Sequence, residues 1–345
     1  MTWLSDRENG AREALPSPVF EYLAQGARDS VSSLEALRGW ADVRFLPHVL
    51  RDVTEVDLSV PLLTSSARVP WGIAPTTQQR AVHPDGEVAM AQATAAAGTV
   101  MVLSSNAGTT FADVAATGVR WWLQAYLPAD RTLAEPLLAR AVDAGAEAIV
   151  LTVDTPVVGT KHAAGDQVVW DVVDPELLRV NFDADYEDAP GSEKATDLGP
   201  HDLVWLAEQT GLPVVAKGVL RADDARRCVQ AGAAAVWVSN HGGRQLDRTA
   251  STATCLPAVV EAVAGHAQVY VDGGIRSGLD VLAALALGAD AVFLGRLPMY
   301  ALVEGVAGVG RMHTDLREET VEAFRLAGCR TVADTRGIAA PAPAP

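Results

Sequence analysis

The chain has 345 residues, of which 49% are hydrophobic and 20% are charged, so it can build a large buried core. Its 43 acidic residues outnumber the 27 basic ones and give a formal net charge of −16, which argues against nucleic-acid binding. The chain shows no membrane-spanning apolar run, no signal-peptide pattern and no CxxC pair among its three cysteines, so we expect a cytoplasmic protein that does not bind membranes.

Residues 1–68 precede the repetitive part of the chain, and we expect them to form an N-terminal helical cap. This segment runs into the sequence VPLLTSSARVP (60–70), in which two short apolar stretches flank a polar turn. A hairpin that closes the floor of the following domain would fit this pattern.

From residue 69 to 330, short apolar runs alternate with helix-like, alanine-rich segments such as 85–98 and 278–290. Each run is apolar on both faces, as expected of strands in a covered parallel sheet. The eight runs are 69–75, 100–105, 120–126, 148–155, 213–219, 234–240, 269–274 and 291–296. Eight such units predict an α/β fold, a TIM (β/α)8 barrel. An open doubly wound sheet is disfavoured, because the glycine-rich corners follow late strands rather than the first.

Two segments depart from the repeat. Residues 156–198 form a long connection after the fourth strand, and their second part, 171–198, carries nine acidic and two basic residues. A connection of this length is usually a lid or disordered. The last residues, 337–345, are rich in proline and alanine and are expected to form a flexible tail. With these additions, residues 1–345 are predicted to be a single domain.

Polar side chains stand at or just after the ends of nearly all the predicted strands, where the active sites of such barrels lie. One such group alone would be a helix cap or a satisfied buried polar residue. Together they indicate a site. They are Thr76, Thr77, Ser104, Asn106, Gln124, Tyr126, Thr152, Asp154, Lys217, Ser239, His241, Arg244, Asp272 and Arg296.

The corners after the last two strands, VDGGIRSG (271–278) and FLGRL (293–297), combine glycines, arginines and helix starts. Backbone N–H groups and a guanidinium from Arg276 or Arg296 predict a phosphate site there. Lys217 stands within an apolar run, which allows three roles. It could form a Schiff base, donate to an electron-rich cofactor atom, or pair with a nearby carboxylate.

The stretch VSNHGGRQLD (238–247) places an imidazole and a guanidinium three residues apart. Arg244 is suited to planar recognition of a carboxylate, and His241 to accepting a proton near neutral pH. Asp154 could orient the imidazole and stabilise its charged form. These residues predict a substrate that bears a carboxylate next to a removable proton.

The motifs SNHGGRQ (239–245), LTVDTP (151–156) and DGGIR.G.DV..ALALGA (272–289) resemble those of the FMN-dependent α-hydroxy acid oxidases and dehydrogenases. This family includes glycolate oxidase, lactate oxidase, mandelate dehydrogenase and flavocytochrome b2. The resemblance implies an FMN cofactor and a homotetramer. It implies that His241 is the base with Asp154 as its partner, that Arg244 and Tyr22 bind the substrate carboxylate, and that Tyr126 lies near the substrate hydroxyl. It further implies a flavin site formed by Lys217 at the N1/O2 edge, by Thr76, Thr77, Ser104, Gln124, Thr152 and Ser239 along the ring, and by Asp272, Gly274, Arg276, Gly295 and Arg296 at the ribityl and phosphate.

Two positions depart from the family pattern. Lys161 stands where glycolate oxidase-like members have a second carboxylate-binding arginine, and Asn106 replaces an aromatic residue after LSS (103–105). Lysine keeps the charge but loses the planar fork. The smaller, polar Asn106 indicates a substrate bulkier or more polar than glycolate.

The expected activity is oxidation of an L-2-hydroxy acid to the 2-oxo acid, as by an (S)-2-hydroxy-acid oxidase, with O2 as the re-oxidant. Electron transfer to a quinone or carrier by a dehydrogenase is the alternative. Both hydride transfer and prior carbanion formation are compatible with the residues. A Schiff-base aldolase that uses Lys217, another FMN barrel such as an isomerase or a nucleotide dehydrogenase, and a non-catalytic binding barrel are less favoured.

Overall fold

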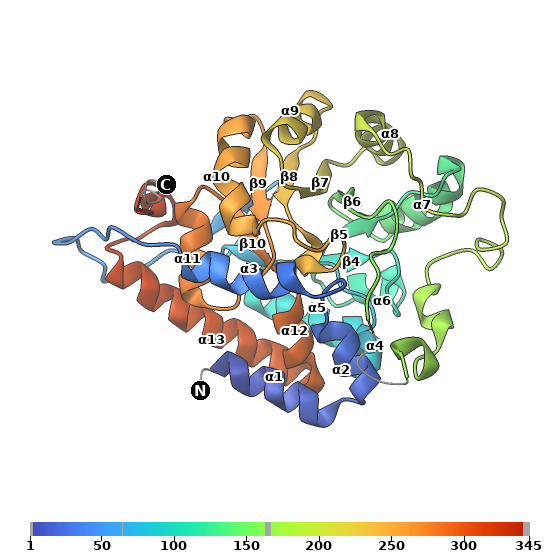
Figure 1. The fold of residues 1–345 in the computed structure, drawn as a ribbon, viewed down its shortest axis with the longest axis horizontal. Coiled ribbons are helices and arrows are strands. Elements are labelled where there is room, and N and C mark those ends of the chain that lie inside the picture. The colour runs from blue at the N-terminus through green and yellow to red at the C-terminus, as the bar shows by residue number, and fades with distance from the viewer. Residues whose placement is uncertain (1–2, 64, 163–166, 341–345) are drawn as a thin grey trace.

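The computed structural model describes residues 3–63, 65–162 and 167–340 (Figure 1). Eight parallel strands close into a barrel in chain order, with β10 pairing back to β3. The predicted TIM barrel is confirmed, and each predicted apolar run coincides with one of its strands. They are β3 (Trp71–Ile73), β4 (Val100–Ser104), β5 (Arg120–Ala125), β6 (Ile149–Thr152), β7 (Val214–Val219), β8 (Ala235–Val238), β9 (Gln268–Val271) and β10 (Ala291–Leu294), although β9 begins one residue before the run 269–274.

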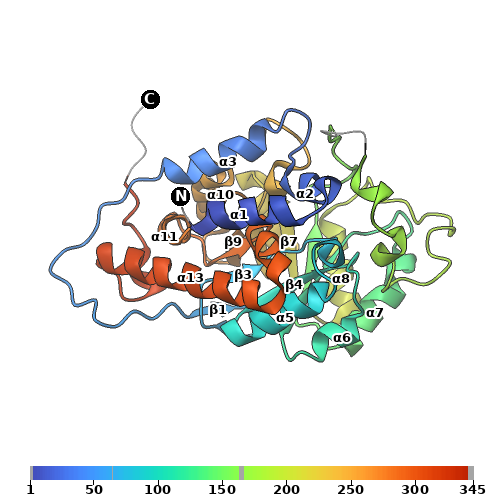
Figure 2. The same cartoon turned by 90° about the horizontal axis from the view of Figure 1, so that it is seen from below.

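Helices surround the barrel and follow its strands. They are α4 (Gln79–Val82), α5 (Gly86–Ala97), α6 (Phe111–Ala115), α7 (Glu135–Asp143), α8 (Pro200–Thr210), α9 (Ala222–Gln230), α10 (Thr252–Val263), α11 (Gly278–Ala286), α12 (Arg296–Ala301) and α13 (Gly305–Leu326). The helix α5 ends at Gly98, whose φ of 70° is the left-handed conformation of a glycine C-cap. The long helix α13 packs against α5 and α11 and closes the ring (Figure 2).

Aromatic side chains fill the inside of the barrel. Phe293 is the centre of this layer, with ring centroids 4.0 Å from Trp237, 5.3 Å from Tyr270 and 5.7 Å from Trp122. Gly72 on β3 is required there, because a Cβ atom would lie 2.6 Å from the Phe293 ring. The interior is therefore a packed core, and chemistry is restricted to the strand ends.

The N-terminal segment covers both ends of the barrel. The strands β1 (Val60–Leu62) and β2 (Ser65–Ala67) pair as an antiparallel hairpin, and their buried side chains join the core inside the barrel. The predicted floor hairpin is thus present. The helices α1 (Trp3–Ala14), α2 (Ser17–Ala24) and α3 (Val31–Ala41) lie near the other end, where α3 packs against α10, α11 and the corner after β8 (Figures 1 and 2).

The connection after β6 lies to one side of the barrel, in green in Figure 1. Its described parts contain short 3-10 turns at Val169–Asp171 and Pro175–Leu178. Asn181 fixes it to the start of α6, because its side chain accepts from the Phe111 N–H at 3.0 Å and donates to the Thr109 carbonyl at 2.9 Å. Within the described residues of this fold, no helix has the length and apolar character needed to cross a bilayer.

The chain end packs against the N-terminal segment over part of the predicted tail. Residues 338–340 bond to 44–46 through their backbones, and Ile338 is buried. These backbone groups are satisfied within the protein, so this portion is held rather than free. Residues 341–345 of the predicted tail lie outside the described residues.

Candidate active site

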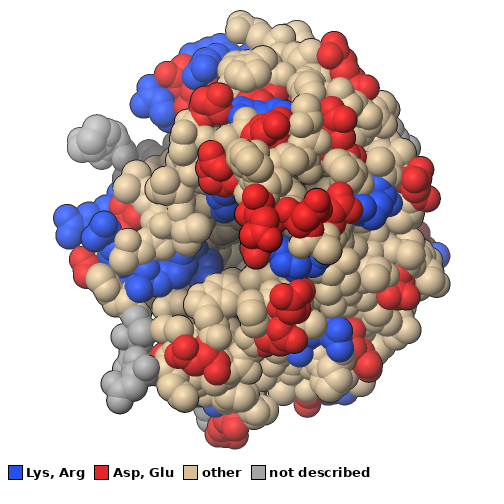
Figure 3. Space-filling model, turned by 90° about the vertical axis from the view of Figure 1, so that its right-hand side faces the viewer, with Lys and Arg blue, Asp and Glu red and all other residues tan. Residues whose placement is uncertain are grey.

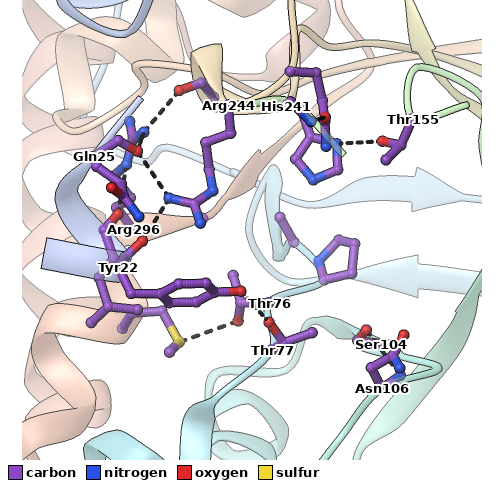
Figure 4. Close-up of a pocket in the computed structure, with 18 of the residues that line it drawn as sticks. Tyr22, Gln25, Thr76, Thr77, Ser104, Asn106, Thr155, His241, Arg244 and Arg296 are labelled. Atoms are coloured by element: carbon purple, nitrogen blue, oxygen red, sulfur yellow. Dashed lines mark hydrogen bonds between the residues drawn. The ribbon is translucent and has the colours of Figure 1, made fainter. Parts of the chain in front are cut away.

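A cavity of about 640 Å³ opens at the carboxyl ends of the strands (Figure 4). Almost all of the predicted site residues line it, although they come from every part of the chain. The lining includes Tyr22, Thr76, Thr77, Ser104, Asn106, Gln124, Tyr126, Thr152, Lys161, Lys217, His241, Arg244, Asp272, Gly274, Arg276, Gly295 and Arg296. Asp154 and Ser239 are the exceptions, and each instead bonds to a lining residue.

Asp154, which follows β6, orients His241, which follows β8. The Nδ1 atom of His241 lies 3.1 Å from Oδ1 of Asp154, and the Thr155 hydroxyl also reaches that oxygen at 3.1 Å. A carboxylate at Nδ1 favours the tautomer with the proton on Nδ1, which leaves Nε2 free to accept a proton. Burial lowers the pKa of His241 below its ordinary value, while Asp154 opposes this shift. Burial alone would raise the pKa of Asp154, but the nearby His241 and Lys217 lower it, and the resulting pKa is below the ordinary value.

Two glycines make this pair possible. Gly218 on β7 has φ +116°, and a Cβ atom there would lie 2.7 Å from Cβ of Asp154. Gly243 has φ +73°, and a Cβ atom there would lie 2.5 Å from the backbone N of Ser33 on α3. His241 itself adopts φ +58°, a conformation uncommon outside glycine. The strand-end corner therefore docks tightly onto the N-terminal helices and turns the imidazole toward the cavity.

Arg244 is anchored by backbone carbonyls of the cap. Its Nη1 donates to the carbonyl oxygens of Tyr22 at 2.6 Å and Gln25 at 2.9 Å, and its guanidinium lies 4.8 Å from the centroid of the Tyr22 ring (Figure 4). The Tyr22 hydroxyl pairs with Thr77 at 2.9 Å. Because the hydrogen bonds of this guanidinium within the described chain use Nη1 alone, its remaining N–H groups can face an anion in the cavity.

Lys217 is buried at the end of β7 in a network of polar side chains. Its Nζ donates to the Ser239 hydroxyl at 3.0 Å and lies 3.3 Å from Oδ2 of Asp272. The Ser239 hydroxyl donates in turn to Oδ1 of Asp272 at 2.7 Å. The carboxylate partner considered from the sequence is therefore present, and it accounts for a lysine held inside an apolar run.

Gln124, on β5, offers the cavity a hydrogen-bond donor that is unpaired within the described chain. The Gln124 side-chain carbonyl accepts from the Ser104 hydroxyl at 3.1 Å, which directs the amide nitrogen away from Ser104. That nitrogen is buried and has no hydrogen-bond partner among the described residues. A buried amide donor beside a large cavity indicates a bound acceptor.

The two arginines of the late corners are held by different groups. Arg276 forms an ion pair with Glu8 of α1 at 2.8 Å. Arg296 donates to the carbonyls of Leu23 at 3.1 Å, Gln25 at 3.3 Å and Gly242 at 2.8 Å. Burial, with Arg244 nearby, lowers the pKa of Arg296 to about 10, so it stays charged at neutral pH. A Cβ atom at Gly295 would meet no atom within 4 Å, which leaves open space beside the start of α12.

The two positions that depart from the family pattern both face the cavity. Lys161 donates to the Gly159 carbonyl at 2.8 Å, and burial, with Arg244 and Lys194 adding, lowers its pKa to about 8. Asn106 donates to the Leu178 carbonyl at 3.2 Å and so ties the end of β4 to the connection after β6. Burial, followed by the charge of Asp154, raises the pKa of Tyr126, which therefore remains a neutral phenol.

Sequence reasoning missed several cavity residues. Gln25 anchors both Arg244 and Arg296 through its carbonyl, a role that any residue type could fill. Thr155, Trp170 and Lys194 also line the cavity. Thr155 follows Asp154 directly, so its position could have been proposed. The other two lie in the connection after β6, where no periodic pattern places side chains.

Comparison with known proteins identifies the family of the chain. The profile of the FMN-dependent dehydrogenase family matches residues 11–339. Glycolate oxidase 1 of Oryza sativa subsp. indica is 41% identical over 341 residues, which cover 94% of this chain and 91% of the relative. Glycolate oxidase of Spinacia oleracea is 40% identical over 349 residues, covering 96% and 93%. A crystal structure of mandelate oxidase with (S)-4-hydroxymandelic acid superimposes with a TM-score of 0.88 at 37% identity, covering 97% of each chain.

The chain therefore belongs to the FMN-dependent dehydrogenase family, and it is an FMN-dependent enzyme of the 2-hydroxy acid oxidase type. The cofactor expected from the sequence is confirmed at the level of the family. The cavity suits FMN, because the unpaired Gln124 amide and the buried Lys217 ammonium offer donors to a polar ring edge. Arg276, Arg296 and the open space at Gly295 could hold its phosphate.

Proposed function

We propose that the protein oxidises an L-2-hydroxy acid, bulkier or more polar than glycolate, to the corresponding 2-oxo acid with O2 as the final electron acceptor. The observation that carries this proposal is the His241–Asp154 pair facing the same cavity as Arg244. A base and a carboxylate anchor that line one cavity fit a substrate that bears a hydroxyl next to its carboxylate.

His241 takes the hydroxyl proton at Nε2, and Asp154 stabilises the imidazolium that results. The lowered pKa of His241 keeps it neutral, and so able to accept the proton, at neutral pH. FMN, when bound, would accept two electrons together with the hydrogen that leaves the reacting carbon, so that the 2-oxo acid forms. Tyr126 remains protonated and donates a hydrogen bond near the substrate hydroxyl.

Arg244 binds the substrate carboxylate, and its orientation is fixed before the substrate arrives. Its Nη1 is held by two carbonyls, so little side-chain entropy is lost on binding. Lys161 adds a second positive charge, and the Tyr22 hydroxyl, set by Thr77, contributes a further polar contact. Lys217 would face the bound cofactor and could balance negative charge that its ring gains.

We propose O2 as the electron acceptor because of the names of the similar proteins. The relatives described above are oxidases by name. A quinone or protein carrier remains the alternative acceptor. A tetramer of the single 1–345 domain is also proposed, and light scattering of the purified protein would test it.

Anaerobic mixing of the purified flavoprotein with a series of (S)-2-hydroxy acids tests the proposal. Bleaching of the flavin by some of these acids, followed by return of the colour and formation of H2O2 on admission of oxygen, is expected. Absence of bleaching with every 2-hydroxy acid would refute the activity. Bleaching that oxygen does not reverse, but a quinone does, would support the dehydrogenase alternative.

A further inference from the structure

Lys194 lines the cavity but has no part in the chemistry described above. It lies in segment 171–198, which contains nine acidic and two basic residues. All nine acidic residues are exposed and none of them lines the cavity, whereas Arg179 and Lys194 are both partly buried and both line it. Of the charged side chains in 171–198, only the two basic ones therefore face the cavity, whereas the acidic ones face solvent. Figure 3 shows this face, with acidic side chains gathered near its centre beside a hollow.

The two inward-facing basic residues differ in their partners. Arg179 is paired with Glu187, whose Oε1 lies 2.6 Å from its Nε. No ion pair joins Lys194 to an acidic residue within 3–63, 65–162 and 167–340; its ammonium instead lies 3.6 Å from the centroid of the Tyr126 ring. Contact with an aromatic face leaves an ammonium its charge and its N–H donors. Lys194 can therefore still bind an anion.

The backbone holds Lys194 in place without an acidic partner. The Ala195 N–H donates to the Leu127 carbonyl at 2.9 Å, and the Ala129 N–H donates to the Glu193 carbonyl at 2.8 Å. Lys194 thus stands opposite Pro128, just beyond the end of β5, where Tyr126 lies. This short antiparallel pairing fixes the residue at the cavity wall.

Lys194 is the third of three cations near one another. Arg244 and Lys161 already provide the charge that a single substrate carboxylate needs. Burial lowers the pKa of Lys194 to about 8, although Asp154 opposes the shift, and the pKa of Lys161 is lowered partly by Lys194 and Arg244. Ammonium groups held close together at a partly buried site are stabilised by a bound anion.

We propose that Lys194 binds a second acidic group of the substrate, so that the substrates are 2-hydroxy dicarboxylic acids. This inference rests on the proposed function and narrows it. Arg244 and Lys161 bind the carboxylate next to the reacting carbon, and Lys194, above Tyr126, binds the distal carboxylate. Lys194 is thus a specificity-determining residue rather than a member of the proton-transfer pair.

The test compares acids that differ in distal charge. Flavin reduction is measured anaerobically with (S)-2-hydroxysuccinate and (S)-2-hydroxyglutarate, and with the uncharged-tail acids (S)-2-hydroxypentanoate and (S)-2-hydroxyhexanoate. The variants are Lys194→Met, Lys194→Arg, which keeps the charge, and Glu193→Gln, an exposed neighbour in the same segment. The dissociation constants of 2-oxoglutarate and 2-oxohexanoate, from flavin absorbance titrations, give a second readout independent of turnover.

For the parent we expect higher kcat/KM with the dicarboxylates. Lys194→Met should lower the ratio of dicarboxylate to uncharged-tail kcat/KM by about 10- to 100-fold, mainly through KM, as expected for loss of a charge-assisted hydrogen bond. It should weaken 2-oxoglutarate binding by a similar factor. Lys194→Arg should restore most of the ratio, and Glu193→Gln should leave it at the parent value.

Two outcomes would overturn the inference while leaving the proposed function intact. In one, the parent reduces its flavin faster with the uncharged-tail acids. In the other, Lys194→Met lowers kcat/KM equally for the dicarboxylates and the uncharged-tail acids. If no 2-hydroxy acid of either class bleaches the flavin, the proposed function fails and this inference fails with it.

Discussion

Nδ1 of His241 lies 3.1 Å from Oδ1 of Asp154, while the second carboxylate oxygen of Asp154 is buried with no partner among the described residues. A buried carboxylate with one oxygen unsatisfied is costly unless its charge is balanced. His241 balances it when the imidazole is protonated, which is the state that follows proton abstraction. Asp154 thus favours the product of the proton transfer, although burial of the imidazole acts in the opposite direction.

Asp154→Asn should slow flavin reduction by about 10²- to 10⁴-fold, because an amide neither balances the imidazolium charge nor selects the tautomer. Stopped-flow reduction under anaerobic conditions measures the effect. Asp223→Asn, on the exposed start of α9, is the matched control and should react at the parent rate. A parent-like rate for Asp154→Asn would show that the pair is structural.

Gly218→Ala tests whether close packing positions Asp154. The new Cβ atom would lie 2.7 Å from Cβ of Asp154, at a φ of +116°. Gly118→Ala is the control, because Gly118 also has a positive φ, +76°, but a Cβ atom there meets nothing within 4 Å. Gly118→Ala should lose about 1–2 kcal/mol of stability from backbone strain alone, and Gly218→Ala should lose more, because its Cβ atom also clashes with Asp154. Only Gly218→Ala should also slow flavin reduction, by about tenfold or more. Equal rates for the two variants would contradict the positioning role.

Lys217→Met should destabilise the protein by about 3–5 kcal/mol, because Asp272 would remain buried without its cation. The double variant Lys217→Met/Asp272→Asn should recover part of that loss, since no buried charge is left unpaired. Neither variant should reduce its flavin at the parent rate. Thermal unfolding in excess FMN and anaerobic reduction separate the two effects. Recovery of the parent rate in the double variant would mean that Lys217 serves only to neutralise Asp272.

The fold was predictable because its signal is local and repeated. Each buried strand is a short apolar run, and each corner carries polar residues at the same end. His241, Arg244 and Asp154 could therefore be placed in one site before any contact was known. The barrel brings them together through strand order alone.

Other features depend on contacts that no local pattern records. The anchoring of Arg244 uses the Gln25 carbonyl, which carries no side-chain signature. The pairing of Arg276 with Glu8 joins residues 268 positions apart. Lys194 reaches the cavity only because its backbone pairs beside Pro128 across a long connection. Charge counting showed this connection to be acidic, but it could not show that its acids face outward.

The pH dependence should reflect one base, His241, and two lysines, Lys161 and Lys194, whose pKa values are lowered. Burial lowers the pKa of His241 below its ordinary value, so the acid limb of kcat/KM for flavin reduction, where the base becomes protonated, should lie at lower pH than the titration of a free imidazole. Asp154 raises that pKa, so Asp154→Asn should move the acid limb to still lower pH. The raised pKa of Tyr126 removes the phenol from this range.

The alkaline limb should depend on the substrate. Lys161 and Lys194 have pKa values near 8, and their neutral forms do not attract carboxylates, so kcat/KM for a 2-hydroxy dicarboxylic acid should fall above about pH 8. An acid with an uncharged tail should show a shallower fall, because only the Lys161 charge then bears on binding. Lys194→Met should give the dicarboxylate the same shallow profile. Parallel alkaline limbs for both substrate classes in the parent would mean that Lys194 does not meet the distal group, because its loss of charge would then affect the two classes equally.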